Sequence, residues 1–234
     1  MRNYYIFSHK KIIYDKYYDV DHKKMTLNYQ VYLKKMYIIE PRKNIIMKDI
    51  KMILQEDFPL SPQSMEELLS IAKISQLKKY QILLREGEIC DHWGYITKGL
   101  LRSYYRKDNR EITEYFSTEG DRFVSIESYY RRVPSQIIIE ALEPTEICAF
   151  QYDEYEILCQ NNPEIGHFTR KIMENSLIWF QRRLDSLQFE SAYKKYQHLS
   201  KTIPRLTLRA SSVHIASYLG ITPETLSRVR TRKM

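Results

Sequence analysis

The sequence predicts an α+β protein in which a small antiparallel β-barrel or jelly roll is followed by helices. Three observations lead to this class. Residues 74–151 hold short β-rich runs separated by turn residues. After Asp153, a candidate N-cap, the pattern of apolar residues becomes helical. The carboxy-terminal residues then have the spacing of two short helices joined by a tight turn.

The predicted strands are short and fall at near-regular intervals. Gly87, the pair Asp108-Asn109 and Gly120 supply turn signals between them. Alternation within the fourth run predicts that Ile112, Glu114 and Phe116 share one face of a sheet. Runs of this length and spacing are typical of a small barrel or jelly roll. The predicted strands cover residues 80–85, 93–96, 99–106, 111–117, 135–140 and 146–151.

Two helix starts carry a proline at the first helical position, one at Ser61-Pro62 and one at Asn162-Pro163. The second helix is predicted to run to about Leu187, roughly 37 Å at 1.5 Å per residue. Its bulky residues recur at steps of three or four, so they lie on one stripe. We expect this stripe to be the interface of a dimer, and the alternative is that it packs on its own barrel. The predicted interface residues are Ile165, Phe168, Ile172 and Trp179.

Composition excludes several classes of protein. No apolar run approaches the roughly 18–20 residues of a membrane span, and no apolar segment of a secretory signal follows the amino terminus. We therefore expect a cytoplasmic protein with no membrane partner.

Cys90, Cys148 and Cys159 lack the spacing of zinc or iron–sulfur ligands, so reduced thiols, no metal and no cofactor are predicted. The histidines are scattered and no catalytic motif is present, which predicts that the chain is not an enzyme.

The net charge of +8 is unevenly distributed. Residues 191–234 hold nine Lys and Arg against one Glu, whereas residues 48–190 hold eighteen against twenty-four Asp and Glu. A basic terminal segment on an acidic body is typical of a DNA-binding module joined to another domain. Residues 1–47 are basic too, with ten Lys and Arg against four Asp and Glu. Residues 1–46 allow two interpretations: a loosely ordered extension, or residues upstream of a true start near Met47.

The segment Ser211–Arg230 has the pattern of a helix-turn-helix. Ile215, Ala216 and Leu219 predict the buried side of the first helix. Gly220 supplies the left-handed residue that ends it. Thr222 and Pro223 are a favourable N-cap and first residue for the second helix, in which Leu226 and Val229 would face inward. The alternative is a helical hairpin with a solvated polar face, and the surrounding basic charge disfavours it.

The outward residues of the second helix suit the major groove of double-stranded DNA. Arg228 can donate two hydrogen bonds to guanine, and Glu224 can accept one from cytosine. Hydroxyl groups near the helix start can reach phosphate oxygens. The predicted DNA-binding residues are Thr222, Pro223, Glu224, Thr225, Ser227, Arg228 and Arg230.

From about Met47 to its end, the chain resembles Crp/Fnr-type transcription regulators, particularly a branch common in Bacteroidetes. The segment Ile215–Arg230 carries most of the likeness, supported by Gly99–Tyr105, Glu111–Phe116 and the helix starts at Asp153 and Pro163. The resemblance implies a cyclic-nucleotide-binding-like β-roll, a long dimerisation helix and a winged helix-turn-helix. It also implies base reading by Glu224 and Arg228. The predicted domains are residues 1–46, an uncharacterised extension; 47–160, the β-roll sensor; 161–189, the dimerisation helix; and 190–234, the DNA-binding domain.

The effector pocket departs from this family's pattern. Members that bind cyclic AMP hold its phosphate with an arginine, and Pro134 stands at that position here. The Gly-Glu pair that would contact the ribose is absent, and so is the amino-terminal cysteine cluster of the iron–sulfur members. Pro223 also replaces a base-contacting arginine of many members, which predicts a different operator. Residues that could line a substitute pocket are Glu127, Arg131, Arg132 and Ser135.

The sequence thus predicts a homodimeric, sequence-specific DNA-binding regulator whose degenerate pocket does not bind cyclic AMP. RNA polymerase and an unknown small-molecule effector are further expected partners. The alternative is a cyclic-nucleotide sensor or regulatory module with no role at DNA.

Overall fold

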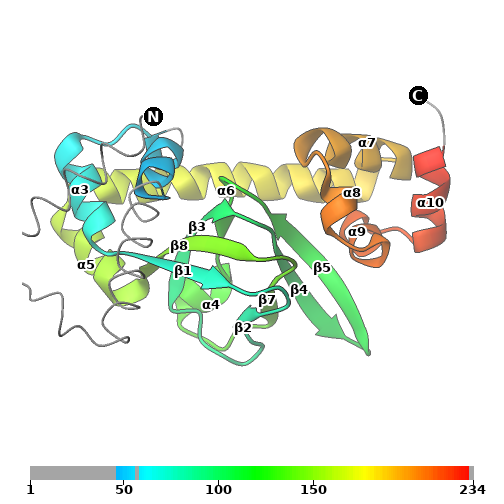
Figure 1. Ribbon diagram of the computed structural model, residues 1–234, viewed down its shortest axis with the longest axis horizontal. Helices are drawn as coiled ribbons and strands as arrows, with labels where there is room; N and C mark the ends of the chain where they lie inside the picture. The colour runs from blue at the N-terminus through cyan, green and yellow to red at the C-terminus, as the bar shows by residue number, and fades with distance from the viewer. Residues whose placement is uncertain (1–45, 56–57, 232–234) are drawn as a thin grey trace, which may run out of the picture. The chain divides into compact units, whose positions relative to one another are not determined.

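The computed structural model describes residues 46–55 and 58–231. The extension expected over residues 1–46 therefore lies outside the described residues, apart from Ile46. Residues 46–55 are helical, and Ile46, Ile50 and Leu54 are buried in the main apolar core. Figure 1 shows the order of the remaining elements along the chain.

Two four-stranded antiparallel sheets form a β-roll (Figure 1). The first sheet has the order β1-β8-β3-β6, and the second has the order β2-β7-β4-β5. The jelly-roll prediction is therefore confirmed, although β1, β6 and the helix α4, Ile126–Arg131, were not predicted. The strands are β1, Ala72–Leu77; β2, Ile82–Leu84; β3, His92–Lys98; β4, Leu101–Lys107; β5, Arg110–Ser117; β6, Arg122–Phe123; β7, Ile137–Ala141; and β8, Thr145–Gln151.

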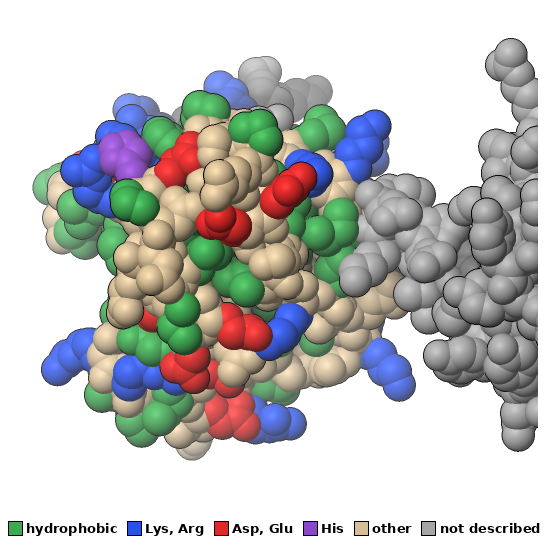
Figure 2. Space-filling model, turned by 90° about the vertical axis from the view of Figure 1, so that its left-hand side faces the viewer, with side chains coloured by type: hydrophobic (Ala, Val, Ile, Leu, Met, Phe, Trp, Pro, Cys, Tyr) green, Lys and Arg blue, Asp and Glu red, His purple; other side chains and the backbone are tan. Residues whose placement is uncertain are grey.

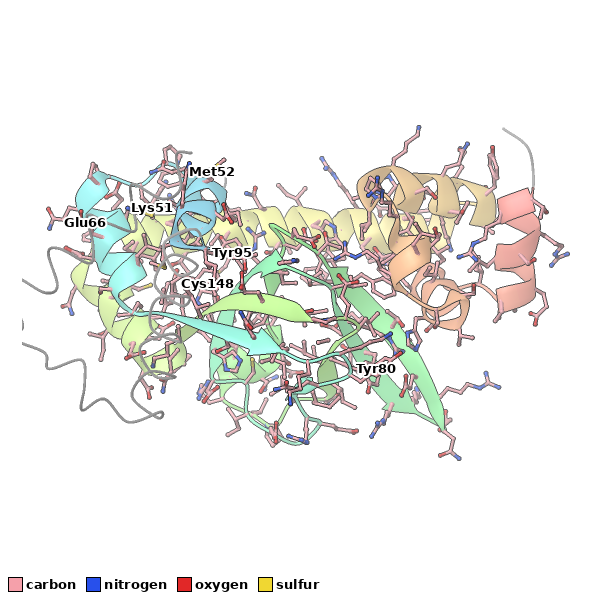
Figure 3. The ribbon with its side chains drawn as sticks, viewed as in Figure 1. Lys51, Met52, Glu66, Tyr80, Tyr95 and Cys148 are labelled. Atoms are coloured by element: carbon pink, nitrogen blue, oxygen red, sulfur yellow. The ribbon has the colours of Figure 1, made fainter. Side chains whose placement is uncertain are left out.

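The first sheet is tightly packed at its centre. Tyr95 on β3 lies opposite Cys148 on β8, and both side chains are fully buried in the roll (Figure 3). A Cβ atom at the neighbouring Gly94 would collide with the backbone of Cys148 and Ala149. Glycine is therefore required at position 94 because two backbones approach each other closely there.

The β4–β5 hairpin turns at the predicted pair Asp108-Asn109, whose φ angles of 50° and 58° are both positive. The expectation that Ile112 and Phe116 share a face is wrong, because Phe116 is 1% exposed and Ile112 is 43% exposed. The pairing of β4 with β5 shifts register between Ser103 and Tyr104. Such an irregularity exchanges the two faces of a strand, which periodicity within one strand does not reveal.

Helices pack against one end of the roll and continue from it. The helix α3, Pro62–Ser70, begins at the predicted cap Ser61, whose hydroxyl accepts from the Ser64 amide at 3.3 Å. The amide and hydroxyl of Ser61 also donate to Glu164 at 2.8 and 2.5 Å. These bonds tie the start of α3 to the start of the long helix. The helix α5, Tyr152–Asn161, connects β8 to that helix.

The long helix α6, Pro163–Phe189, starts as predicted, because the Asn162 side chain accepts from the amides of Glu164 and Ile165. Ile165 and Phe168 are fully buried in the chain's own core, and Ile172 is partly buried against it. The ring of Trp179 packs edge-on against Tyr115 of β5, with 4.7 Å between centroids. The stripe predicted as a dimer interface thus packs on its own roll. A helical period detects an apolar face but does not say what covers it.

The described residues after Gln151 form helices and no strand, so no wing is built from them. The helices that follow α6 are α7, Ala192–Thr202; α8, Leu206–Arg209; α9, Ser212–Leu219; and α10, Pro223–Thr231.

The face that carries α3 and α5 shows apolar side chains and charges of both signs intermixed (Figure 2). No single patch of one kind gathers there. No helix within the described ranges is long and apolar enough to cross a membrane.

Candidate nucleic-acid interface

The helix α9 is held by caps at both ends. At its start, the Ser211 hydroxyl accepts from the His214 amide at 3.2 Å. At its end, Gly220 has φ 63° and donates its amide to the last turn. Ile215, Ala216 and Leu219 are buried, as the sequence predicted. The local sequence therefore determines both the ends and the buried face of α9.

The helix α10 begins three residues after Gly220. The Thr222 hydroxyl accepts from the Thr225 amide at 3.2 Å, which is the bond expected of an N-cap. Leu226 is fully buried, and α10 packs on α7 and α9. The two helices and their short turn thus share one small core with α7.

One face of α10 is polar and open to solvent. Glu224 and Arg228 are exposed, and the Arg228 guanidinium donates to the Thr225 hydroxyl at 3.0 Å. A hydrogen bond from Thr222 lowers the pKa of Glu224, and the charge of Arg228 acts in the same direction. The Glu224 carboxylate is therefore charged at neutral pH. The other exposed members of this face are Thr222, Pro223 and Ser227, while Thr225 is half-buried.

Arg230 departs from its predicted outward position. Its guanidinium donates to the Ser212 hydroxyl at 2.9 Å and lies over the ring of Tyr196 at 5.9 Å. The Nε and Nη2 atoms are buried and make no hydrogen bond. Arg230 therefore points back onto the helical unit that α7, α8, α9 and α10 form, residues 192–231. Its position follows from the contacts of α10 with α7 and α9, which the one-dimensional pattern does not contain.

The helical unit shares an apolar cluster with the roll. Leu100, Phe116 and Leu142 of the roll lie in the same buried cluster as Leu219 and Leu226. At the rim, Arg209 forms ion pairs with Glu119 at 2.9 Å and with Glu143 at 2.7 Å. Sequence patterns do not reveal this contact, because the two glutamates lie 66 and 90 residues from Arg209.

The predicted effector residues do not converge on one cavity. Glu127 and Arg131 pair with each other at 2.8 Å on the exposed side of α4. Arg132 instead donates to the Cys90 carbonyl at 2.8 Å and lies over the ring of Tyr152. Ser135 is buried and shares a 2.9 Å hydrogen bond with Ser125. Each of the four residues is engaged with a neighbour in the chain.

Aromatic rings of α4 and α5 pack against one another. Tyr129 packs edge-on against Tyr130 and Tyr152, with 5.0 Å between centroids in each pair. Burial raises the pKa of Tyr130 to about 12, so its hydroxyl is neutral. Two hollows of the described residues lie elsewhere, one at the β4–β5 turn and one beside α7 and α8.

The cysteines have the properties of unreactive thiols. Cys90 and Cys148 are buried, Cys159 is half-buried, and none forms a disulfide. Burial raises the pKa of each, in the case of Cys148 to about 12. Residues 46–55 and 58–231 contain no cluster of His, Cys, Asp and Glu that could hold a metal ion.

Residues 74–162 match the cyclic nucleotide-binding domain family. The match covers the roll from within β1 to the end of α5, so this part of the chain is similar in sequence to cyclic nucleotide-binding domains. No curated protein matches the chain.

Solved structures with the same fold include transcriptional regulators. FixK2 from Bradyrhizobium japonicum is 18% identical, with a TM-score of 0.60, over 69% of this chain and 84% of that one. A structure from Eubacterium rectale, assigned to the Crp/Fnr family of transcriptional regulators, is 20% identical with a TM-score of 0.58, over 74% and 85%. The c-di-GMP-responsive regulator CLP from Xanthomonas campestris is 16% identical with a TM-score of 0.57, over 72% and 89%.

These likenesses establish the architecture of a β-roll followed by a long helix, as in Crp/Fnr-family structures. The identities are low, so the likeness concerns the fold. The assignment to a Bacteroidetes branch stays a prediction.

The turn between α9 and α10 yields a direct test. Gly220→Ala is expected to lower the free energy of unfolding by about 1–2 kcal/mol, because a Cβ atom is strained at positive φ. Gly220→Asn should cost less, since asparagine tolerates this conformation. Urea denaturation of the two variants and the parent measures both. A Gly220→Ala variant as stable as the parent would contradict the left-handed turn.

Proposed function

We propose that the chain is a homodimeric, sequence-specific DNA-binding transcription regulator of Crp/Fnr type. The observation that carries the proposal is the exposed polar face of α10, with Glu224 and Arg228 side by side on a capped helix. A helix with this face fits the major groove, where arginine reads guanine and glutamate reads cytosine. Such a regulator acts on the chromosome, so we place it in the cytoplasm.

The basic charge of the helical unit supports the same proposal. Residues 191–234 hold nine Lys and Arg against Glu224 alone. Of these, Arg209 is paired within the chain and Arg230 is turned inward. Lys194, Lys201 and Arg205 are exposed and can approach phosphate oxygens. Binding through such contacts weakens steeply with salt because condensed counterions are released.

A second apolar stripe on α6 supports dimerisation. It follows the helix at steps of four, three, four and three residues, which is the repeat of a coiled-coil seam. Its members are exposed by 39–72% in the single chain, whereas the stripe predicted from the sequence is covered by the roll. We therefore assign the interface between two copies to this second stripe, Met173, Leu177, Phe180, Leu184 and Leu187.

The roll, we propose, does not respond to cyclic AMP. Pro134 stands where the phosphate-binding arginine is expected, and it is exposed at a bridge to Ile89. Arg132, a partly buried arginine two residues before Pro134, donates instead to the Cys90 carbonyl and lies over the Tyr152 ring. An effector of other chemistry and a contact with RNA polymerase remain predictions from the resemblance.

DNA binding is tested by selecting a site from random duplexes and measuring the Kd for that site. Arg228→Ala should weaken binding by about 1–3 kcal/mol, roughly fivefold to 150-fold, and relax preference at one base pair. Arg131→Ala, on an exposed arginine of α4, serves as the control and should leave the Kd unchanged. The proposal fails if no sequence is selected above competitor DNA at moderate salt.

The interface is tested by placing a charge on each side of α6. Phe180→Glu should convert the dimer to a monomer, because two carboxylates would be buried against each other in the seam. Ile178→Glu is the matched control, since Ile178 is 51% exposed and lies off the stripe. Sedimentation velocity measures the mass of each. A Phe180→Glu dimer as stable as the parent would place the interface elsewhere.

Calorimetric titration decides between this proposal and a cyclic-nucleotide module without a role at DNA. Cyclic AMP and cyclic GMP should each give no binding isotherm in the micromolar range. Micromolar binding of either would contradict a degenerate pocket. Combined with the absence of a selected DNA site, such binding would favour the sensor module.

A further inference from the structure

The helix α9 packs on β5, which is the edge strand of the second sheet. The outer side of an edge strand leaves backbone groups without a ladder partner. Ser217 supplies partners for two of them. The Thr113 amide donates to the Ser217 hydroxyl at 2.9 Å, and that hydroxyl donates to the Glu111 carbonyl at 3.2 Å. A single serine of the helical unit thus binds the backbone of the roll at two points.

A buried arginine lies beside this contact. Arg102 of β4 is 1% exposed, and its Nε donates to the Thr113 hydroxyl at 2.9 Å. Its Nη1 atom lies 2.6 Å from a carboxylate oxygen of Glu111 and 3.1 Å from Nε2 of His214 on α9. The Nη2 atom is buried without a hydrogen bond. Arg102 is therefore joined to both the edge strand and the helical unit.

The hydrogen bond from Arg102 determines the protonation state of His214. A guanidinium carries donors only, so the imidazole Nε2 must accept and the ring must be neutral. The remaining nitrogen, Nδ1, is buried and makes no hydrogen bond. Protonation of His214 would put a donor against a donor and a second positive charge beside Arg102.

The other charges around His214 do not reverse this preference. Glu111 of β5 lies 4.0 Å from Nε2 and favours the protonated ring. Glu140 of β7 interacts electrostatically with Glu111, Arg102 and Arg106 of β4. Burial raises the pKa of Glu140. Burial, followed by the charge of Arg102, lowers the pKa of His214 despite Glu111. The helix α9 itself carries no other charged side chain.

We propose that His214, Arg102 and Glu111 form an acid-sensitive latch that stabilises the contact of α9 with β5 near neutral pH and weakens it on acidification. The device couples the position of the helical unit to proton concentration. It acts through the described contacts of one chain and requires neither an effector in the roll nor DNA.

The direction of the pH dependence follows from the lowered pKa of His214. The released state binds a proton more readily than the latched state, so latch stability rises with pH. Its full contribution is present above the ordinary histidine pKa of about 6.5 and is lost as pH falls toward the lower, latched value. At pH 5.5 the equilibrium constant for closing can fall by at most about tenfold.

Hydrogen exchange of peptides covering β5 and α9 measures the latch in the full chain. After correction for the intrinsic pH dependence of exchange, protection should fall severalfold between pH 7.5 and pH 5.5 in the parent protein. His214→Gln keeps an acceptor for Arg102 and removes the titration, so its protection should be independent of pH. His198→Gln, an exposed histidine of α7, is the matched control and should behave as the parent.

Ser217→Ala verifies that exchange reports on this contact, because it removes both backbone bonds and should lower protection at every pH. The latch is refuted if parent and His214→Gln proteins show the same pH dependence. It is refuted equally if parent protection does not change with pH while Ser217→Ala lowers it. Because no DNA enters the measurement, failure here is distinguishable from failure of the proposed function.

Discussion

The apolar cluster shared by the roll and the helical unit is the constraint on which the described arrangement depends. Leu100, Phe116 and Leu142 come from the roll, and buried residues of α7, α8, α9 and α10 complete the cluster. Removing such side chains from water stabilises by roughly 1.5–3 kcal/mol each. Neither part can cover its half of the cluster alone, so α9 is positioned by the roll. The exposed face of α10 is in turn positioned by α9.

Polar contacts around that cluster determine its orientation. Apolar burial is non-directional and would tolerate rotation of α9 on the sheet. Ser217 binds two backbone groups of the edge strand, and Arg209 is held between Glu119 and Glu143. Arg183 of α6 donates to the Tyr218 carbonyl and stacks on the Tyr218 ring. The roll, α6 and α9 therefore hold one another in a defined geometry at a single junction.

The two faces of α6 differ in what covers them within one chain. One face buries Ile165 and Phe168 in the roll and is complete in a single chain. The adjacent face keeps the repeat of a coiled-coil seam and is exposed. Both stripes have apolar residues at steps of three and four, so periodicity alone does not distinguish them. The first was predicted as the interface because it is a bulky apolar stripe on a long helix, and such a stripe suits any buried site, including the chain's own core.

Local features were readable from the sequence. Ser61, Asn162, Gly220 and Thr222 act at the helix ends where they were predicted, because caps and left-handed turns depend on residues within a few positions of each other. The β-roll followed from strand length and turn residues. The tertiary structure alone decided which stripe of α6 is covered, that Arg230 turns inward, and that Arg102 meets His214. Each of these depends on side chains brought together across the fold, whose distances no local pattern encodes.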